Sequence, residues 1–359
     1  MVAQTTQAID PAKVEAFAGR MLQILNGGML SLLISVGHQT GLFETLAGLH
    51  PSTSQEIASA AGLHERYVRE WLAGMVTGGI IEYDPMLKTY ALPAEHAAML
   101  TRAAGPNNLA VLAPFVSQYG AIEQGVISSF RNGGGVPYNA APHIQHLQDD
   151  LNRAVYDATL ISTTLPLVPG LVDKLRAGIE ALDIGCGEGH VLNLMAQAFP
   201  NSHFTGYDFQ EDGIAAAQEE ARALGITNVR FELKDVASLD TSASYDLVTA
   251  FDVIHDLAHP RPVLSAIHRA LKPGGTLLMV DIAASSNLED NLEHPIAPAL
   301  YTVSLFHCMT VSLAQGGEGL GTMWGEQKAR ELLAESGFTR VDVQQVPGDF
   351  QNNYYIAGK

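Results

Sequence analysis

Residues 181–208 constrain the fold more than any other part of the chain. An apolar run leads into Asp183 and then into a loop with the spacing G-x-G-x-G at residues 185–189. A helical pattern follows, and then a second apolar run that ends in Asp208. Strand, glycine loop, helix, strand and acid are the layout of a nucleotide site at the carboxyl end of a parallel sheet. Glycines let the backbone approach a ligand closely, and an ionised carboxylate accepts hydrogen bonds from both hydroxyls of a ribose.

The spacing of the loop also indicates which nucleotide would bind. The dinucleotide fingerprint is G-x-G-x-x-G, whereas this loop is one residue shorter and follows Asp183. An acid at that position disfavours a pyrophosphate and suits a ligand that carries an ammonium or a sulfonium. Residues 182–189 resemble the first motif of the class I S-adenosylmethionine-dependent methyltransferases. A dinucleotide oxidoreductase is a weaker alternative, because the loop spacing speaks against it.

Later segments resemble the remaining motifs of that family in the same order. They are a strand with an acid at residues 229–236, a strand leading to His255 at 245–255, a Pro-Gly-Gly turn and strand at 270–281, and two strands at 338–346 and 354–357. The resemblance covers about residues 150–359. It implies a Rossmann-like, seven-stranded α/β domain that uses S-adenosylmethionine and releases S-adenosylhomocysteine.

The resemblance also implies where the cofactor binds. The candidate residues lie on the glycine loop and at the ends of the next strands: Asp183, Gly185, Cys186, Gly187, Asp208, Phe209, Asp235, Val236 and Phe251. Asp208 is expected at the ribose, Asp235 at the adenine amino group and Phe209 beside the adenine. Cys186 is expected to pack rather than to react, because no base is evident beside it.

His255 and Asp256 are the candidate catalytic residues. Methyl transfer from a sulfonium mainly requires alignment of the nucleophile, the methyl group and the sulfur, but a hydroxyl acceptor must also lose a proton. The pair resembles the His-Asp-Trp segment of plant-type O-methyltransferases, whose histidine is the general base, although Leu257 stands in place of the tryptophan. A structural histidine bonded to backbone is the alternative. His259 is four residues after His255, but Pro260 disfavours a helix there, so no metal is expected.

The N-terminal part of the chain predicts a winged helix. A capping box at residues 53–56 begins one helix, residues 64–77 form the next, and residues 80–92 form a hairpin. Residues 1–150 nevertheless carry seven basic and twelve acidic residues, a net charge of 7 − 12 = −5. A DNA-binding domain must neutralise several phosphates, so we expect a dimerisation and lid domain. A winged-helix transcriptional regulator that senses S-adenosylmethionine is the alternative.

These patterns predict three parts: a winged-helix dimerisation and lid domain at 1–100, a helical connector at 101–170 and the methyltransferase domain at 171–359. An insertion at residues 283–325 is rich in aromatic side chains and contains a glycine run at 316–321 that is expected to act as a flexible hinge. It predicts a small apolar or aromatic substrate, methylated most readily at oxygen. The sequence shows no basic segment followed by an apolar one at its start, it has only two cysteines, and its apolar stretch at 29–36 is too short to span a membrane. We therefore expect a cytoplasmic protein that does not bind a membrane. We also expect a homodimer that does not bind nucleic acid.

Overall fold

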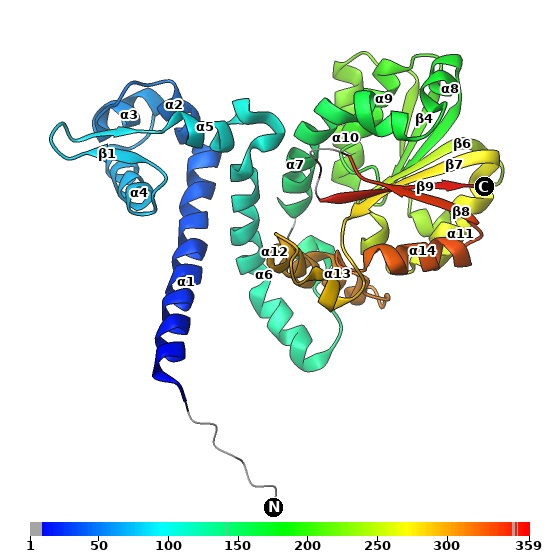
Figure 1. The fold of residues 1–359 in the computed structure, drawn as a ribbon. Helices are drawn as coiled ribbons and strands as arrows, with labels where there is room; N and C mark the ends of the chain where they lie inside the picture. Colours follow the sequence, from blue (N-terminus) through cyan, green and yellow to red (C-terminus); the bar gives the residue numbers. More distant parts are fainter. Residues whose placement is uncertain (1–8, 142, 347–348, 350) are drawn as a thin grey trace, which may run out of the picture. The chain divides into compact units, whose positions relative to one another are not determined.

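The computed structural model describes residues 9–141, 143–346, 349 and 351–359, so the first eight residues, on which the expected lack of a leader depends, lie outside it. The described chain divides into two compact units, residues 1–117 and residues 118–359 (Figure 1). The boundary falls within α6 (Ala113–Asn132).

The first unit contains the predicted winged helix. Its elements after the first helix are α2 (Leu42–Ala47), α3 (Ser54–Ala61), α4 (Glu65–Thr77), the hairpin β1 (Glu82–Asp84) and β2 (Thr89–Ala91), and α5 (Ala94–Leu100). Thr53 and Glu56 form the predicted capping box at the start of α3. The core of the unit is apolar, with Phe43, Leu72 and Met75 fully buried. The helix–turn–helix and hairpin prediction is therefore confirmed.

The first helix, α1 (Pro11–Thr40), extends beyond both ends of the apolar helical pattern at residues 14–36. It begins where the Asp10 side chain accepts a hydrogen bond from the Ala12 N–H, and it ends at Gly41 in the left-handed conformation. By length and hydropathy, two described segments are long and apolar enough to cross a membrane, namely α1 and Ala297–Ala314. A third candidate exists if the bent helix pair His146–Leu167 and Leu171–Ala177 is counted as one span. The expectation that this region is too short to span a membrane considered only the apolar run at residues 29–36, whereas the whole of α1 passes the test of length and hydropathy.

The second unit is built on a seven-stranded sheet. Its strands are β3 (Glu180–Ile184), β4 (His203–Asp208), β5 (Val229–Leu233), β6 (Tyr245–Phe251), β7 (Leu271–Ile282), β8 (Arg340–Gln344) and β9 (Asn352–Gly358). The order is β5-β4-β3-β6-β7-β9-β8. The first five of these are parallel, and β9 is antiparallel to both β7 and β8. This is the predicted Rossmann-like sheet with its closing antiparallel hairpin.

Helices cover both faces of the sheet (Figure 1). α8 (Leu171–Ala177), α9 (His190–Ala198) and α10 (Glu211–Ala223) pack on one face, where Leu192, Met195 and Phe204 are buried. α11 (Pro260–Ala270) and α14 (Gly325–Glu335) pack on the other, around Leu264, Leu332 and Phe338. With both faces covered, the inner strands are continuously apolar and the polar carboxyl ends of the parallel strands lie along one edge.

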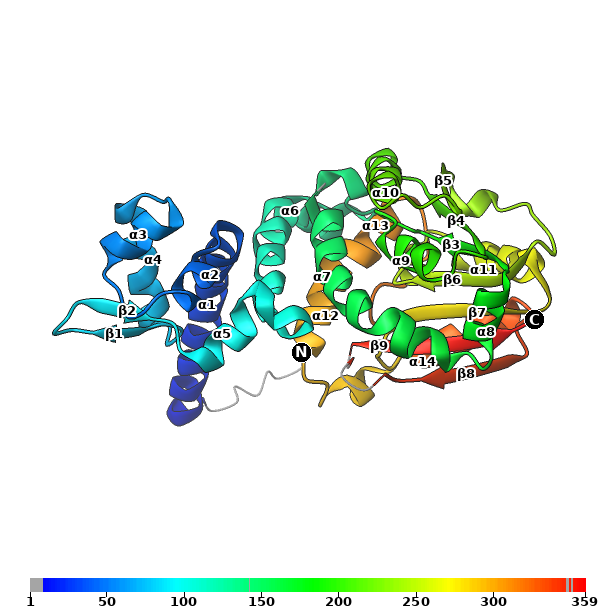
Figure 2. The ribbon, with the colours of Figure 1, turned by 90° about the horizontal axis from the view of Figure 1, so that it is seen from above.

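The remaining helices gather beside that edge. They are the second-unit part of α6, α7 (His143–Thr159), α12 (Ala297–Val303) and α13 (Met309–Ala314), which continues α12 through a π-helical turn at Ser304–Cys308. Figures 1 and 2 both show α6 alongside α12 and α13. The ring of Tyr119 on α6 lies 5.9 Å from that of Phe306, and the Val136 N–H donates to Thr310 Oγ1 at 2.8 Å. The helices before the sheet and the insertion after β7 therefore pack on each other.

Candidate active site

The glycine loop lies between β3 and α9, as predicted. Gly185, Gly187 and Gly189 all adopt positive φ, of 66°, 53° and 75°, a region that residues with a Cβ rarely enter. A Cβ on Gly185 would also collide with the side chain of Val253, which follows β6. The loop is therefore packed against the end of β6 and presents its backbone at the carboxyl edge of the sheet.

Asp208 holds the loop in place from the end of β4. Its Oδ2 accepts a hydrogen bond from the Gly187 N–H at 2.9 Å, and its Oδ1 accepts one from the Gln210 N–H at 2.9 Å. Burial raises the pKa of Asp208, although these N–H donors oppose the rise. The predicted ribose acid and the predicted glycine loop thus form one hydrogen-bonded unit.

Asp183 lies beneath the loop, paired across the sheet with Thr249 on β6. The Thr249 hydroxyl donates to Asp183 Oδ1 at 2.6 Å, and burial raises the pKa of Asp183 to about 7. Cys186 follows Gly185 in the loop, and its N–H donates to the Tyr207 carbonyl. Burial raises the pKa of the Cys186 thiol, which keeps it protonated and unreactive at neutral pH.

Asp235 and Val236 lie one strand further along the same edge. The Lys234 N–H donates to the Asp208 carbonyl at 2.8 Å, which places Asp235 next to the end of β4. Asp235 is exposed, and its Oδ1 accepts from the Ala237 N–H at 2.9 Å. The side chain of Val236 is buried in the core of the sheet, so only its backbone is available to a ligand.

Two tyrosines connect the aromatic candidates to other parts of the unit. The Phe251 ring, at the end of β6, lies 5.1 Å from that of Tyr156 on α7. Phe209 is more than half exposed, and its ring lies 5.9 Å from that of Tyr138. Tyr138 in turn lies 5.2 Å from the buried ring of His307. A line of aromatic rings therefore runs from the residue after Asp208 to the insertion.

His255 lies in a helical turn after β6, Ile254–Asp256, and is buried. Its Nδ1 is 2.8 Å from Oδ1 of Asp281 on the neighbouring strand β7. The same Asp281 oxygen accepts a hydrogen bond from Trp324 Nε1 at 2.8 Å. A carboxylate can only accept, so Nδ1 carries the hydrogen and Nε2 is the nitrogen left for a reacting group. The alternative of a histidine bonded to backbone is not what the structure shows.

The surroundings of His255 and His307, which are both buried, shift their pKa values in opposite directions. Burial alone would lower the pKa of His255, but Asp281 and Asp256 outweigh it and raise that pKa well above its usual range. Burial lowers the pKa of His307, with a smaller opposing effect of Asp256. The Nε2 atom of His307 has no hydrogen-bond partner among the described residues. His307 belongs to the insertion at residues 283–325 and was not among the candidate catalytic residues in the sequence.

Asp256 lies on the free side of the His255 ring. Its Oδ1 is 3.3 Å from His255 Nε2 and accepts no hydrogen bond from the described residues. Cys308 is buried next to both, and the donor atoms of the three side chains lie within 4.8 Å of one another. His259, considered in the sequence as a metal ligand, instead stands at the start of α11. The structure therefore brings His255 and Asp256 together with Asp281, Trp324 and Cys308.

The sequence missed Asp281 and misread the glycine run at 316–321. Asp281 carries a signal in retrospect, because it is the acid at the end of an apolar strand next to β6. The glycine run is bonded rather than free. The Glu318 N–H donates to the Ala258 carbonyl and the Gly321 N–H to the His255 carbonyl, at 2.9 and 3.2 Å. The glycine run thus supports the turn that carries His255. The structure therefore corrects the expectation that this run is a flexible hinge.

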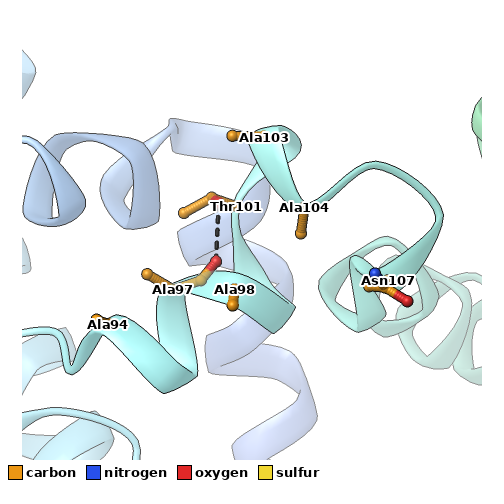
Figure 3. A pocket seen from close by; sticks show the side chains of 7 residues that line it. All are labelled: Ala94, Ala97, Ala98, Thr101, Ala103, Ala104 and Asn107. Atoms are coloured by element: carbon orange, nitrogen blue, oxygen red, sulfur yellow. Dashed lines mark hydrogen bonds between the residues drawn. The ribbon is translucent and has the colours of Figure 1, made fainter.

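A hollow of about 430 Å³ in the first unit lacks comparable chemistry (Figure 3). It is lined by small side chains and two uncharged polar residues: Ala94, Ala97, Ala98, Thr101, Ala103, Ala104 and Asn107. The Thr101 hydroxyl donates to the Ala97 carbonyl at 2.8 Å, which occupies its donor. The candidate chemistry is therefore at the edge of the sheet in the second unit.

Comparison with known proteins supports this division of the chain. Residues 175–337 match the methyltransferase domain family, and residues 28–102 match the Rv2258c-like winged HTH domain. The malonyl-[acyl-carrier protein] O-methyltransferase of Paenibacillus sp. (strain JDR-2) is 29% identical over 181 residues, which are 50% of this chain and 60% of that protein. The chain thus matches less than two thirds of this relative.

Solved structures with the same fold span nearly the whole chain. A candidate O-methyltransferase from Nostoc punctiforme has a TM-score of 0.72 and 20% identity, covering 98% of this chain and 100% of its own. Human N-acetylserotonin methyltransferase, solved in complex with S-adenosylmethionine, has a TM-score of 0.70 and 17% identity, covering 99% of both chains. The chain therefore contains a region that matches a methyltransferase domain, preceded by a region that matches a winged HTH domain, and it shares its fold with these solved structures.

Proposed function

We propose that this protein transfers the methyl group of S-adenosylmethionine to a small apolar or aromatic molecule, most readily at an oxygen atom. The observation that carries the proposal is the hydrogen bond from the Gly187 N–H to Asp208, at the same sheet edge as the His255–Asp281 pair. The cofactor supplies a methyl group on a positively charged sulfur. The chain's own residues have to hold it, align the acceptor and take a proton.

The residues at the sheet edge fit this cofactor. Gly185 and Gly187 adopt positive φ, so the loop presents backbone without side chains at this edge, and Asp208 offers carboxylate oxygens for a ribose. The loop, with Cys186 contributing backbone, would surround the methionine part, and the buried charge of Asp183 suits its cationic groups. Asp235, the backbone of Val236 and the ring of Phe209 would contact the adenine, while Phe251 would lie against the cofactor at the end of β6.

His255 is the proposed general base, and Asp256 and Asp281 are the residues that position it. Asp281 fixes the tautomer in which Nε2 is free, and Trp324 holds Asp281. In its neutral form, which the raised pKa favours only at high pH, this histidine takes the proton of a hydroxyl as the oxygen attacks the methyl group. We propose that the reaction needs no metal, although Cys308 and Asp256 lie close enough to Nε2 to share one. Activity that survives dialysis against EDTA supports this, and activity restored only by a divalent cation contradicts it.

The proposed acceptor is an apolar or aromatic molecule because aromatic side chains surround the base. Tyr119 and Phe306 lie together near Cys308, and Tyr138 packs on His307. Burial is the main reason why the pKa values of Tyr119 and Tyr138 are raised, so both phenols stay neutral. Neutral rings with hydroxyl groups suit a planar acceptor better than a polyanion.

The alternative function is a transcriptional regulator, which the winged helix alone would permit. The helix that would enter DNA is α4, and its two arginines are engaged within the helix itself. Arg66 pairs with Glu70, and Arg69 pairs with Glu65 at 3.3 Å. Binding of duplex DNA that weakens steeply with salt would favour the regulator, and we expect no such binding.

We further propose that residues 1–100 form a domain that pairs two copies of the chain and covers the substrate. Residues 101–170 would connect this domain to the methyltransferase domain at residues 171–359. We also propose that the protein is cytoplasmic. The support is the exposed apolar surface of α1, where Phe17, Leu22 and Met29 are each more than 60% exposed in the single chain. Exposed apolar patches of this kind mark interaction surfaces. The charge balance of this half makes a second copy a better partner than nucleic acid.

Calorimetric titration with S-adenosylmethionine, S-adenosylhomocysteine and NAD tests the proposed function, on the wild type and on Asp208→Ala. We expect micromolar binding of the two sulfur nucleotides, lost in the variant, and no binding of NAD. Since Asp208 also fixes the loop, Asp208→Asn serves as the milder variant. Binding of NAD alone, or of none of the three, would overturn the proposal. A screen of phenols with labelled cofactor then identifies the acceptor.

A further inference from the structure

Asp252 has an unusual backbone conformation at the end of β6. It is one of only three non-glycine residues with positive φ in the described chain, with φ at 53°. Its N–H donates to the Val280 carbonyl at 2.9 Å, so the neighbouring strand β7 fixes the backbone at this point. A left-handed residue with a side chain is unfavourable and tends to persist where function needs the side chain in that direction.

The carboxyl group of Asp252 has an oxygen without a partner. Oδ1 is shielded from solvent and accepts no hydrogen bond from the described residues. The charged neighbours are mostly acidic, namely Asp281, Asp349 and Asp256, with His255 as the one opposing charge. Burial and then Asp281 raise the pKa of Asp252 to about 7. A buried acceptor that lacks a donor is costly in a folded protein, and a cationic donor would satisfy it.

Asp252 lies beside the proposed cofactor site. The next residue, Val253, is the one that packs against Gly185 of the glycine loop. Burial, followed by the charge of Asp252 and, more weakly, that of Asp183, raises the pKa of the Tyr156 phenol. Tyr156 therefore lies near both acids, between the end of β6 and the end of β3.

The two acids that adjoin the glycine loop already accept hydrogen bonds, whereas Asp256 Oδ1, which also lacks a donor, lies 3.3 Å from His255 Nε2. Asp208 accepts from the Gly187 and Gln210 N–H groups, and Asp183 Oδ1 accepts from Thr249. A sulfonium has no hydrogen to donate, whereas an ammonium group has three. The free oxygen of Asp252 thus matches the ammonium of an amino acid better than any other part of the cofactor.

We propose that Asp252 is the counter-ion that binds the ammonium group of the methionine part of the cofactor. The assignment rests on the proposed function, since it places a specific contact within the same site. It makes Asp252 a residue that distinguishes ligands with an amino-acid end from ligands that contain only the adenosine. Asp183 then contributes its charge from beneath the loop.

Two ligands separate this role from a structural one. S-adenosylhomocysteine carries the ammonium, and 5′-methylthioadenosine has the same thioether and adenosine without the amino acid. The variant is Asp252→Asn, which keeps the volume and tolerates the left-handed backbone. The control is Asp246→Asn at the opposite end of β6, where Asp246 accepts from Lys272 Nζ and the Glu180 N–H.

Calorimetry on the full chain should show that Asp252→Asn weakens S-adenosylhomocysteine about tenfold or more while the affinity for 5′-methylthioadenosine stays within about twofold. Asp246→Asn should leave the ratio of the two affinities unchanged from the wild type. Retained binding of 5′-methylthioadenosine also shows that the variant is folded. An equal loss for both ligands, or no loss for either, overturns the assignment and leaves the proposed function intact. A wild type that binds neither ligand overturns both.

Discussion

At the scale of single residues, two buried histidines in the second unit differ in their charge state. His255 lies between Asp281 and Asp256, which favour its cation, whereas burial favours the neutral form of His307. Environments that separate the pKa values of two neighbouring groups often assign them different roles. Here His255 has the fixed tautomer and His307 has the unpartnered nitrogen.

Replacing His255 by Gln should lower kcat by about 10²- to 10⁴-fold, the range expected for loss of a general base. The affinity for S-adenosylhomocysteine should remain, because the described partners of the His255 side chain are Asp281 and Asp256 rather than residues of the glycine loop. His307→Gln is the matched control, a buried histidine next to the same aromatic rings, and its effect on kcat should be smaller. A larger loss in the His307 variant would transfer the base role to that residue.

The raised pKa of His255 sets the expected pH dependence. The neutral form is the base, so activity should be full at high pH and fall as the pH drops below the raised pKa. Asp256→Asn removes one of the carboxylates that raise this pKa, so the acid limb of the kcat profile should move to lower pH. An unchanged limb would show that another group controls it. The profile of Asp246→Asn, which does not touch His255, is the comparison.

At the scale of elements, the segment after α6 depends on a close contact with α13. A Cβ on Gly135 would overlap the backbone at Thr310 and Ala314, and the next N–H donates to Thr310 Oγ1. This contact holds together two helices that are more than 170 residues apart in the sequence.

Gly135→Ala should therefore lower the free energy of unfolding by about 1–3 kcal/mol, the usual cost of overpacking. Gly120→Ala in α6 is the matched control, because a Cβ there meets nothing and alanine favours a helix by up to about 1 kcal/mol. Its stability should be unchanged or higher. Thermal melts followed by circular dichroism compare the two. Equal melting temperatures would mean that the contact between Gly135 and α13 can rearrange without a loss of stability.

Elements with a local signal could be predicted from the sequence, and the acids of the site could not. Caps, apolar periodicity and glycine spacing depend on neighbours in sequence, so α3, α4, the hairpin and the positions of the central strands along the chain were correctly predicted. Asp281 meets His255 only because β7 pairs with β6, across 26 residues of sequence. Asp252 is defined by a backbone angle, for which its type gives no signal. The helical pattern at residues 14–36 correctly ran through Gly27 and Gly28, but it fell short of both ends of α1 at Pro11 and Thr40.

At the scale of the whole molecule, the apolar surface of α1 predicts association. The double variant Phe17→Glu/Leu22→Glu should convert a dimer to a monomer, because two charges cannot be buried unpaired in an apolar interface. Tyr67→Glu on α4, an exposed position of the same unit, should leave the mass unchanged. Light scattering coupled to size exclusion measures the mass. A monomeric wild type that floats with lipid vesicles would assign α1 to a membrane instead.

The bond from Trp324 to Asp281 gives the protein an internal optical reporter. The chain has two tryptophans, and the other, Trp71, donates to the Leu33 carbonyl within the first unit. Only the Trp324 indole shares its hydrogen-bond acceptor with the proposed base. A change in protonation of His255 alters the field at that indole, so intrinsic fluorescence should titrate with the catalytic group. The proton can thus be followed without a substrate and before the acceptor is known.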